Sequence, residues 1–139
     1  MSAAFVLDAS LALSWCFSDE ATAASRRIQD RLESETAVVP GLWFLEVANV
    51  LALAERRKKL TAAATAELVT LFGAFDLEVD DEASGRAFGH LLPICRAHGL
   101  SAYDAVYLDL ALRRRLPLAT LDDELRSAGR KLGLDLLGK

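Results

Sequence analysis

The chain has 139 residues, with 16 lysines and arginines against 20 aspartates and glutamates, and a net charge of −4. This length is typical of one domain, so we expect a single domain over residues 1–139. An apolar fraction of 53% excludes a disordered chain. The acidic balance argues weakly against nucleic-acid binding, because lysine and arginine drive contacts to phosphate. The two cysteines, Cys16 and Cys95, lack a Cys-x-x-Cys spacing and are expected to be reduced thiols.

The N-terminal segment lacks the features of a signal peptide. Residues 1–8 contain no basic residue and reach an acid, Asp8, almost at once. The longest nearly apolar run, 41–54, is interrupted by Glu46 and Asn49 and is too short to span a bilayer. We therefore expect a soluble, cytoplasmic protein.

Short apolar runs alternate with helical patterns along the whole chain. Strands are predicted at 5–7, 37–39, more weakly at 77–79, at 116–119, and as a possible edge strand at 134–137. Helices are predicted at about 11–17, 19–33, 42–58, 62–75, 82–98, 102–114 and 123–131. This alternation predicts an α/β fold with a mostly parallel sheet flanked by helices, which binds ligands at the carboxyl ends of its strands.

Several residues mark where the predicted helices begin or are interrupted. Ser18, Thr61 and the pair Asp80-Asp81 stand where N-caps are expected. Pro93 lies inside the predicted helix 82–98 and should kink or break it.

Asp8 ends the first predicted strand, so its carboxylate would project into the crevice at the sheet edge. The alternative is that Asp8 is the N-cap of the helix that starts at Leu11. Ser10 could equally be that cap, which would leave Asp8 free for chemistry.

Glu46 lies in the segment 43–53, where almost every other residue is apolar. Asn49 is three residues further on, so the two side chains share one helix face. An ionised carboxylate in such surroundings is costly unless it is paired or bound to a metal. The alternative is that both residues occupy a narrow stripe facing solvent.

Asp104 follows Ser101 by three residues, which is the spacing of a capping box. The carboxylate would then lie in the first helical turn, where backbone N–H groups favour its ionised form. A purely structural capping box is the alternative.

Asp122 and Asp123 follow the fourth predicted strand, and one of them is expected to cap the next helix. We assign the site role to Asp122, because Thr120-x-Asp122 repeats the pairing of an acid with a small polar residue seen in Asp8-x-Ser10.

The four acids suggest a particular chemistry if they converge. Two carboxylates about 4 Å apart repel each other by roughly 4 kcal/mol at an effective dielectric near 20. Four in one cleft would partly protonate unless a cation were present. Oxygen ligands favour Mg²⁺, or Mn²⁺, over zinc. Mg²⁺ held by a few carboxylates is suited to in-line displacement at a phosphate.

The four motifs, in their order and spacing, resemble PIN domains, and most closely the VapC toxins of bacterial toxin–antitoxin pairs. The resemblance spans nearly the whole chain. It rests on Leu7-Asp8-Ala9-Ser10, Glu46-x-x-Asn49, Ser101-x-x-Asp104-Ala105 and Thr120-Leu121-Asp122. It implies a three-layer α/β/α sandwich around a parallel sheet and Mg²⁺-dependent endoribonuclease activity. It also implies a homodimer and a small cognate antitoxin whose C-terminal segment blocks the cleft.

The resemblance also assigns roles to individual residues. Asp8 and Asp104 would be the principal metal ligands, while Glu46 and Asp122 would complete the acidic site directly or through water. Three further residues match supporting polar positions: Ser10, Asn49 and Thr120. With the four acids set aside, the remaining acidic and basic residues are equal in number, so the net charge does not exclude an RNA substrate.

Two rival functions remain open at the level of sequence. The chain could be a catalytically silent PIN-like module that binds a protein or RNA. It could instead be an aspartyl-phosphate protein that uses Asp8 as nucleophile, although such a phosphatase would carry an aspartate where this chain has Ser10. Neither a Gly-rich phosphate loop nor a Gly-x-Ser-x-Gly elbow occurs.

Overall fold

The computed structural model describes residues 2–139. Five short strands form one sheet in the order β3-β2-β1-β4-β5, and every pair of neighbours is parallel. The strands are β1 (Phe5–Leu7), β2 (Ala37–Pro40), β3 (Leu77–Asp80), β4 (Leu118–Ala119) and β5 (Leu136–Leu137). All five were predicted, although the last two begin two residues later than expected.

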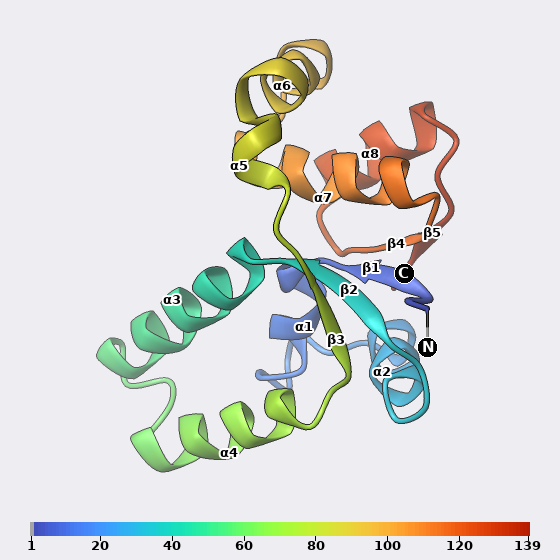
Figure 1. The fold of residues 1–139 in the computed structure, drawn as a ribbon. Coiled ribbons are helices and arrows are strands. Elements are labelled where there is room, and N and C mark those ends of the chain that lie inside the picture. The colour runs from blue at the N-terminus through green and yellow to red at the C-terminus, as the bar shows by residue number, and fades with distance from the viewer. Residues whose placement is uncertain (1) are drawn as a thin grey trace.

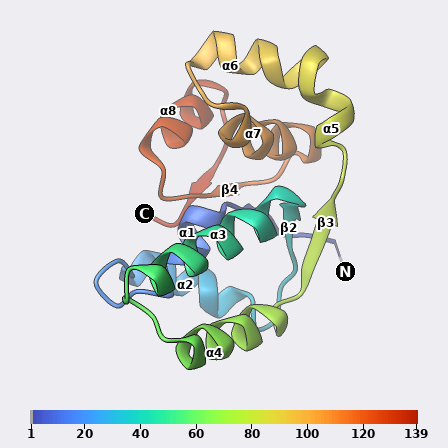
Figure 2. The ribbon, with the colours of Figure 1, turned by 90° about the vertical axis from the view of Figure 1, so that its left-hand side faces the viewer.

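Helices cover both faces of this sheet. They are α1 (Ala9–Ser14), α2 (Ala23–Arg31), α3 (Leu42–Arg56), α4 (Ala62–Gly73), α5 (Ala83–Arg86), α6 (Leu92–His98), α7 (Ala102–Arg114) and α8 (Asp123–Lys131). Helices α1 to α4 lie below the sheet and α5 to α8 above it (Figure 1), and the side view shows the same three layers (Figure 2). The predicted three-layer α/β/α sandwich is confirmed. Within residues 2–139, no helix combines the length and the apolar character needed to cross a membrane.

Helix α2 begins later than the sequence suggested. The prediction started this helix at residue 19 with Ser18 as its cap, which is wrong. The cap is Thr22, whose hydroxyl accepts the backbone N–H of Ser25 at 3.0 Å. The hydroxyl of Ser25 accepts the backbone N–H of Thr22 in return, at 2.9 Å. This reciprocal capping box satisfies two N–H groups at once, which Ser18 does not achieve.

The predicted helix 82–98 is not continuous. It consists of α5, a π-helical turn η1 (Ala87–Leu91) and α6. Pro93 lies in the first turn of α6, where its missing N–H costs no helical hydrogen bond. The expected interruption therefore takes the form of a π turn directly before the proline.

The predicted caps of α4 and α5 differ in outcome. Thr61 caps α4 as predicted, accepting the N–H of Ala64 at 3.1 Å. Asp80 accepts the N–H of Glu82 at 3.2 Å, but Glu82 itself occupies the cap position of α5.

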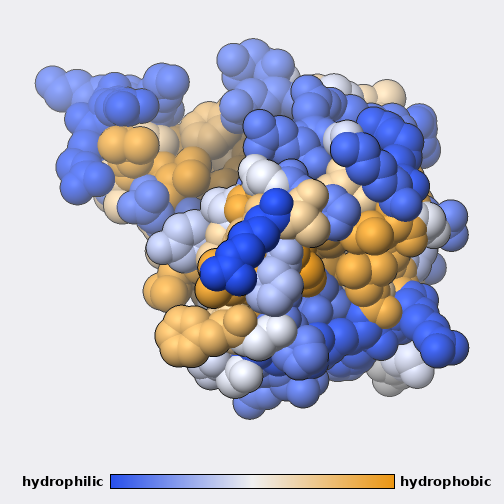
Figure 3. All heavy atoms as spheres, turned by 90° about the horizontal axis from the view of Figure 1, so that it is seen from above, coloured by the Kyte–Doolittle hydropathy of each residue, from blue (hydrophilic) through white to orange (hydrophobic). Residues whose placement is uncertain are grey.

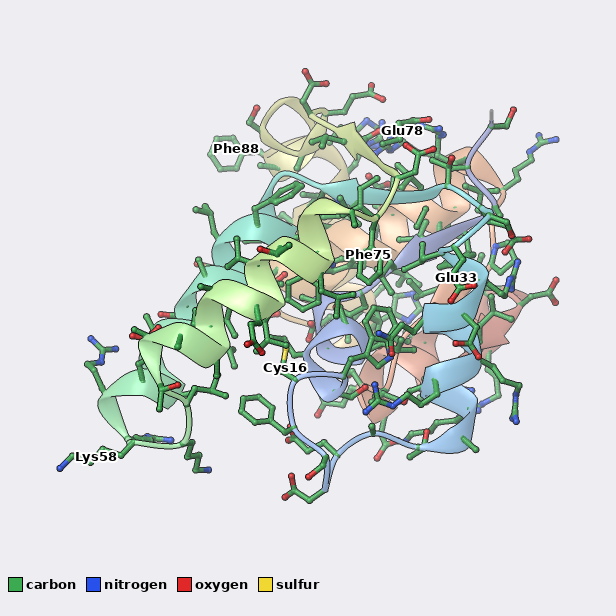
Figure 4. The ribbon with its side chains drawn as sticks, turned by 90° about the horizontal axis from the view of Figure 1, so that it is seen from below. Cys16, Glu33, Lys58, Phe75, Glu78 and Phe88 are labelled. Carbon is green, nitrogen blue, oxygen red and sulfur yellow. The ribbon has the colours of Figure 1, made fainter. Side chains whose placement is uncertain are left out.

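The core lies between the sheet and helices on both faces. Strand β1 is completely buried at the centre of the sheet, and Trp43 and Tyr107 are the largest side chains with almost no exposure. Phe75 points inward from the end of α4 (Figure 4), and its ring meets that of Trp15 edge-on at a centroid distance of 5.7 Å. Because β1 is buried on both faces, the residue that follows it is fixed firmly in space.

Helix α7 is anchored against β3 and α5 by a partly buried network of ion pairs. Arg113 contacts Asp80 at 3.0 Å and Glu82 at 2.7 Å, while Arg86 contacts Asp109 at 2.7 Å. Burial alone would raise the pKa of both aspartates, but the arginine donors hold each pKa below its ordinary value. The network fixes the orientation of α7, and with it the acid in the first turn of that helix.

Candidate active site

Asp8 stands directly after β1 at the cap position of α1, yet its side chain caps nothing. Its Oδ2 instead accepts the hydroxyls of Ser10 and Thr120, each at 2.6 Å. The residue is only 4% exposed, and burial raises the pKa of Asp8, opposed by the two hydroxyl donors. Ser10, the other possible cap, lies inside α1. The carboxylate of Asp8 is thus oriented from two elements and is not used to start a helix.

The two hydroxyls that hold Asp8 are themselves held by backbone groups. Thr120 Oγ1 accepts the N–H of Asp122 at 3.0 Å, and Ser10 Oγ accepts the N–H of Leu121 at 3.3 Å. Because these N–H groups occupy hydroxyl lone pairs, each hydroxyl is left with its proton to donate to Asp8. The arrangement ties the end of β4 to the start of α1.

Glu46 lies on α3 and is half-buried. Its Oε1 accepts the hydroxyl of Tyr107 from α7 at 2.6 Å. Burial raises the pKa of Glu46, the Tyr107 hydroxyl opposes this, and the carboxylates of Asp8 and Asp104 raise it further. Asn49, three residues on, is exposed, and no hydrogen bond joins it to the acids in the described part of the chain.

Asp104 is the third residue of α7, and its backbone N–H donates to the hydroxyl of the cap residue Ser101 at 3.1 Å. Burial and the nearby carboxylates of Asp122 and Asp8 raise the pKa of Asp104 to about 6. Backbone N–H groups at the start of a helix favour the ionised carboxylate, and at Asp104 burial and the neighbouring acids together outweigh that effect.

Asp122 and Asp123 have different surroundings. Asp122 is the cap residue of α8 and accepts the N–H of Leu125 at 2.8 Å. Its charge raises the pKa of both Asp8 and Asp104. Asp123 is exposed and paired with Lys139 at 2.5 Å, which lowers its pKa. The structure therefore places Asp122, and not Asp123, beside the other acids.

Three residues near this cluster were not singled out from the sequence. Tyr107 follows Asp104 by one helical turn, a spacing that could have suggested it. Glu124 adds a further charge that raises the pKa of Asp104. The buried guanidinium of Arg126 donates to the backbone oxygen of Thr120 at 2.8 Å and to that of Leu137 at 2.9 Å, and no local sequence pattern signals this contact.

The donor set fits a hard divalent cation. Asp8, Glu46 and Asp104 each have a pKa raised by at least one other acid of the cluster, and a cation relieves such repulsion. All available donors are oxygens, which Mg²⁺ and Mn²⁺ prefer. Across residues 2–139, no three His, Cys, Asp or Glu side chains are arranged closely enough to hold a metal ion by themselves. A site in which only one or two carboxylates bind the ion directly suits Mg²⁺, which keeps several of its bound waters.

Comparison with known proteins identifies the family of the chain. No curated protein matches it. The structure is similar to the crystal structure of PAE2754 from Pyrobaculum aerophilum, with a TM-score of 0.67 and 25% sequence identity over 92% of this chain and 87% of that chain. Residues 5–131 match the PIN domain, a fold whose members are typically metal-dependent nucleases. This match includes all four acids of the cluster, and the chain belongs to the PIN domain family.

Proposed function

We propose that the chain is a Mg²⁺-dependent endoribonuclease that acts as the toxin of a toxin–antitoxin pair. The observation that carries this proposal is the acid cluster. Asp8, Glu46 and Asp104 come from three separate elements, and each has its pKa raised by burial and by another acid. Such crowding is costly for folding, so a bound cation and a catalytic use offer a physical reason for it.

In this proposal Asp8, Asp104 and Asp122 hold the metal, Asp122 through a bound water, because no three acids among residues 2–139 are close enough to bind it directly. When bound, Mg²⁺ would orient the attacking water and neutralise the charge that develops on the phosphate. The hydroxyls of Ser10 and Thr120 keep the Asp8 carboxylate in one orientation.

Glu46 is suited to accept the proton of the attacking water. Its Oε1 is occupied by Tyr107, so Oε2 would receive the proton while the water oxygen bonds to phosphorus. The bond from phosphorus to the leaving ribose oxygen then breaks, and that oxygen is protonated from solvent. A raised carboxyl pKa brings a general base closer to the pH at which the enzyme works.

RNA is the substrate we propose for this site. Tyr103, next to Asp104, is 64% exposed, and its aromatic ring is a group on which a base can stack. The balanced charge outside the acid cluster implies weak binding that decreases with salt.

Two partner surfaces support the proposed homodimer and the proposed antitoxin. Leu45 and Phe88 are 70% and 88% exposed, and the ring of Phe88 stands clear of the molecule (Figure 4). Apolar areas interrupt the mostly hydrophilic face that contains α6 (Figure 3), and such patches favour protein contacts. A groove of about 290 Å³ between α3 and α4 supports the docking of an apolar antitoxin segment. It is lined by Trp43, Phe44, Val47, Ala48, Leu51, Val69, Phe72 and Gly73.

We propose the cytoplasm as the location of the protein. The two cysteines, Cys16 and Cys95, are free thiols and half-buried, which is compatible with a reducing compartment.

The test is cleavage of RNA by the purified protein, free of antitoxin, with and without Mg²⁺. We expect cleavage with Mg²⁺, none with a chelator, and a loss of at least about 100-fold in Asp8→Asn and in Asp104→Asn, in line with the removal of one charge-stabilising group. Asp123→Asn is the matched control and should cut normally, because Asp123 is paired with Lys139 outside the cluster. Equal cleavage by wild type, Asp8→Asn and Asp104→Asn would refute the assignment.

The same assay separates the rival function of a silent binding module. Such a module would retain RNA or a partner protein without cutting it, and its affinity would not depend on Mg²⁺. A role in binding alone also does not explain why Asp8, Glu46 and Asp104 are crowded together, since binding needs no converging carboxylates.

A further inference from the structure

The hydroxyl of Tyr107 reaches the acid cluster from the core. The side chain has 0% exposure, and its ring belongs to the packed interior beneath α7. Its oxygen lies 2.6 Å from Glu46 Oε1, so one hydrogen bond joins α7 to α3 across 61 positions of sequence. Tyr107 also follows Asp104 by one helical turn.

The surroundings of the phenol fix the direction of this hydrogen bond. Burial, the charge of Asp8 and the contact with Glu46 all raise the pKa of Tyr107, so its oxygen keeps its proton. A phenol O–H donates and a carboxylate oxygen accepts, so Tyr107 gives the proton of this bond to Glu46.

We propose that Tyr107 is a positioning residue that fixes the Glu46 carboxylate beside Asp8 and Asp104 for the hydrolysis. This role rests on the proposed function. Glutamate has three rotatable side-chain bonds, and a half-buried carboxylate without a partner would turn toward solvent. The charge-assisted bond from a rigid, buried phenol holds one of its oxygens in place and leaves the other for the attacking water.

The hydrogen bond between Tyr107 and Glu46 does more than satisfy a buried hydroxyl. A buried tyrosine needs one hydrogen bond, and any backbone carbonyl would provide it. Here the hydroxyl instead binds the carboxylate of Glu46, whose pKa is raised by burial and then by Asp8 and Asp104. Burial keeps the phenol protonated, because it raises the pKa of Tyr107, and the donor is therefore present whatever the charge of Glu46.

Kinetics of RNA cleavage by Tyr107→Phe test the proposal. The substitution removes only the hydroxyl, and we expect kcat to fall about 10- to 100-fold, the factor that one hydrogen bond to a charged group provides. KM for RNA should change less than about 3-fold, because the buried phenol does not reach the substrate. Thr70→Val is the matched control: it removes a hydroxyl of α4 that donates only to the backbone oxygen of Ala66, and it should keep the wild-type kcat.

A double-mutant cycle separates this role from a general loss of packing. In a Glu46→Gln background, adding Tyr107→Phe should change kcat less than about 3-fold, because the group on which Tyr107 acts is already altered. An equal fold-loss in the wild-type and Glu46→Gln backgrounds would overturn the proposal, as would a Tyr107→Phe enzyme with wild-type kcat.

A crystal structure of Tyr107→Phe tests the same claim without cleavage. We expect the Glu46 side chain to leave its present position while the backbone of α3 stays in place. A Glu46 carboxylate unmoved in this variant would overturn the positioning role even if the wild type cuts RNA. If the wild type does not cut RNA, the proposed function fails, and movement of Glu46 in this structure would still show that Tyr107 holds it.

Discussion

At the scale of single residues, the most informative feature is the free-energy cost of bringing the carboxylates of the acid cluster together. This cost is clearest at Asp104, because burial and the carboxylates of Asp122, Asp8 and Glu124 raise its pKa from 3.8 to about 6. The folded state therefore binds a proton on Asp104 more tightly than the unfolded state does. It follows that this residue lowers stability increasingly as the pH rises through about 6.

Asp104→Asn should therefore stabilise the metal-free protein at neutral and higher pH. We expect the free energy of unfolding to rise by about 1 kcal/mol near pH 8, a value reduced for partial solvent screening. Near pH 4, where Asp104 is protonated in the folded state, the gain should vanish. Urea unfolding at both pH values in the presence of a chelator measures this, and a gain of the same size at both would contradict the assigned cause.

A site residue could be predicted from the sequence where its own short segment of chain identifies it. Asp8, Asp104 and Asp122 stand at strand ends or first helical turns, and their places along the chain already indicate a shared edge of the sheet. The role of Asp122 over Asp123 depends on Lys139, which pairs with Asp123 from the end of the chain. For Tyr107, the sequence offers only its spacing of one helical turn from Asp104, because the residue that it contacts lies 61 residues away.

At the scale of elements, α7 unites the site with the rest of the fold. Its first turns carry Asp104 and Tyr107, while Asp109 and Arg113 in its second half fasten it to β3 and α5. The sequence marks the start of α7 through Ser101. It does not reveal the ion pairs, because their partners come from other elements.

Arg113→Ala should destabilise the fold. The change leaves Asp80, whose side chain is 6% exposed, without its main partner. We expect the free energy of unfolding to fall by about 2 kcal/mol. This is less than for a fully buried pair, because Arg114 remains near Asp80. Lys139→Ala removes an exposed ion pair and is the control, with an expected loss below about 0.5 kcal/mol. Thermal unfolding of both variants measures the difference, and equal losses would show that the α7 network adds nothing beyond a surface contact.

The element boundaries that sequence reasoning missed share one physical origin. Ser18 and Thr22 both precede helical sequence, and the reciprocal bond with Ser25 decides between them. The π turn before Pro93 depends on how a whole helix accommodates one missing N–H. Helix ends of this kind are decided by competing hydrogen bonds, which residue type alone does not rank.

At the scale of the whole molecule, the order of strands makes the site. Asp8 follows β1, and Thr120 follows the neighbouring strand β4, so parallel pairing brings the two residues together with 112 positions between them. Alternation of strands and helices predicted a parallel sheet, but it did not specify that β1 and β4 are neighbours. The same topology places the starts of α1 and α8 at the carboxyl ends of these neighbouring strands, where Asp8 and Asp122 lie near each other although no local pattern connects them.

The central claim is the proposal that Asp8 and Asp104 bind a divalent cation at this edge of the sheet. Crystals soaked in Mn²⁺ test it most directly, because the anomalous scattering of Mn²⁺ reports its position. The account predicts a peak about 2.2 Å from a carboxylate oxygen of Asp8 and of Asp104, lost in Asp8→Asn and kept in Asp123→Asn. No peak beside these two acids at a Mn²⁺ concentration that supports RNA cleavage, or a peak only at other residues, would contradict it.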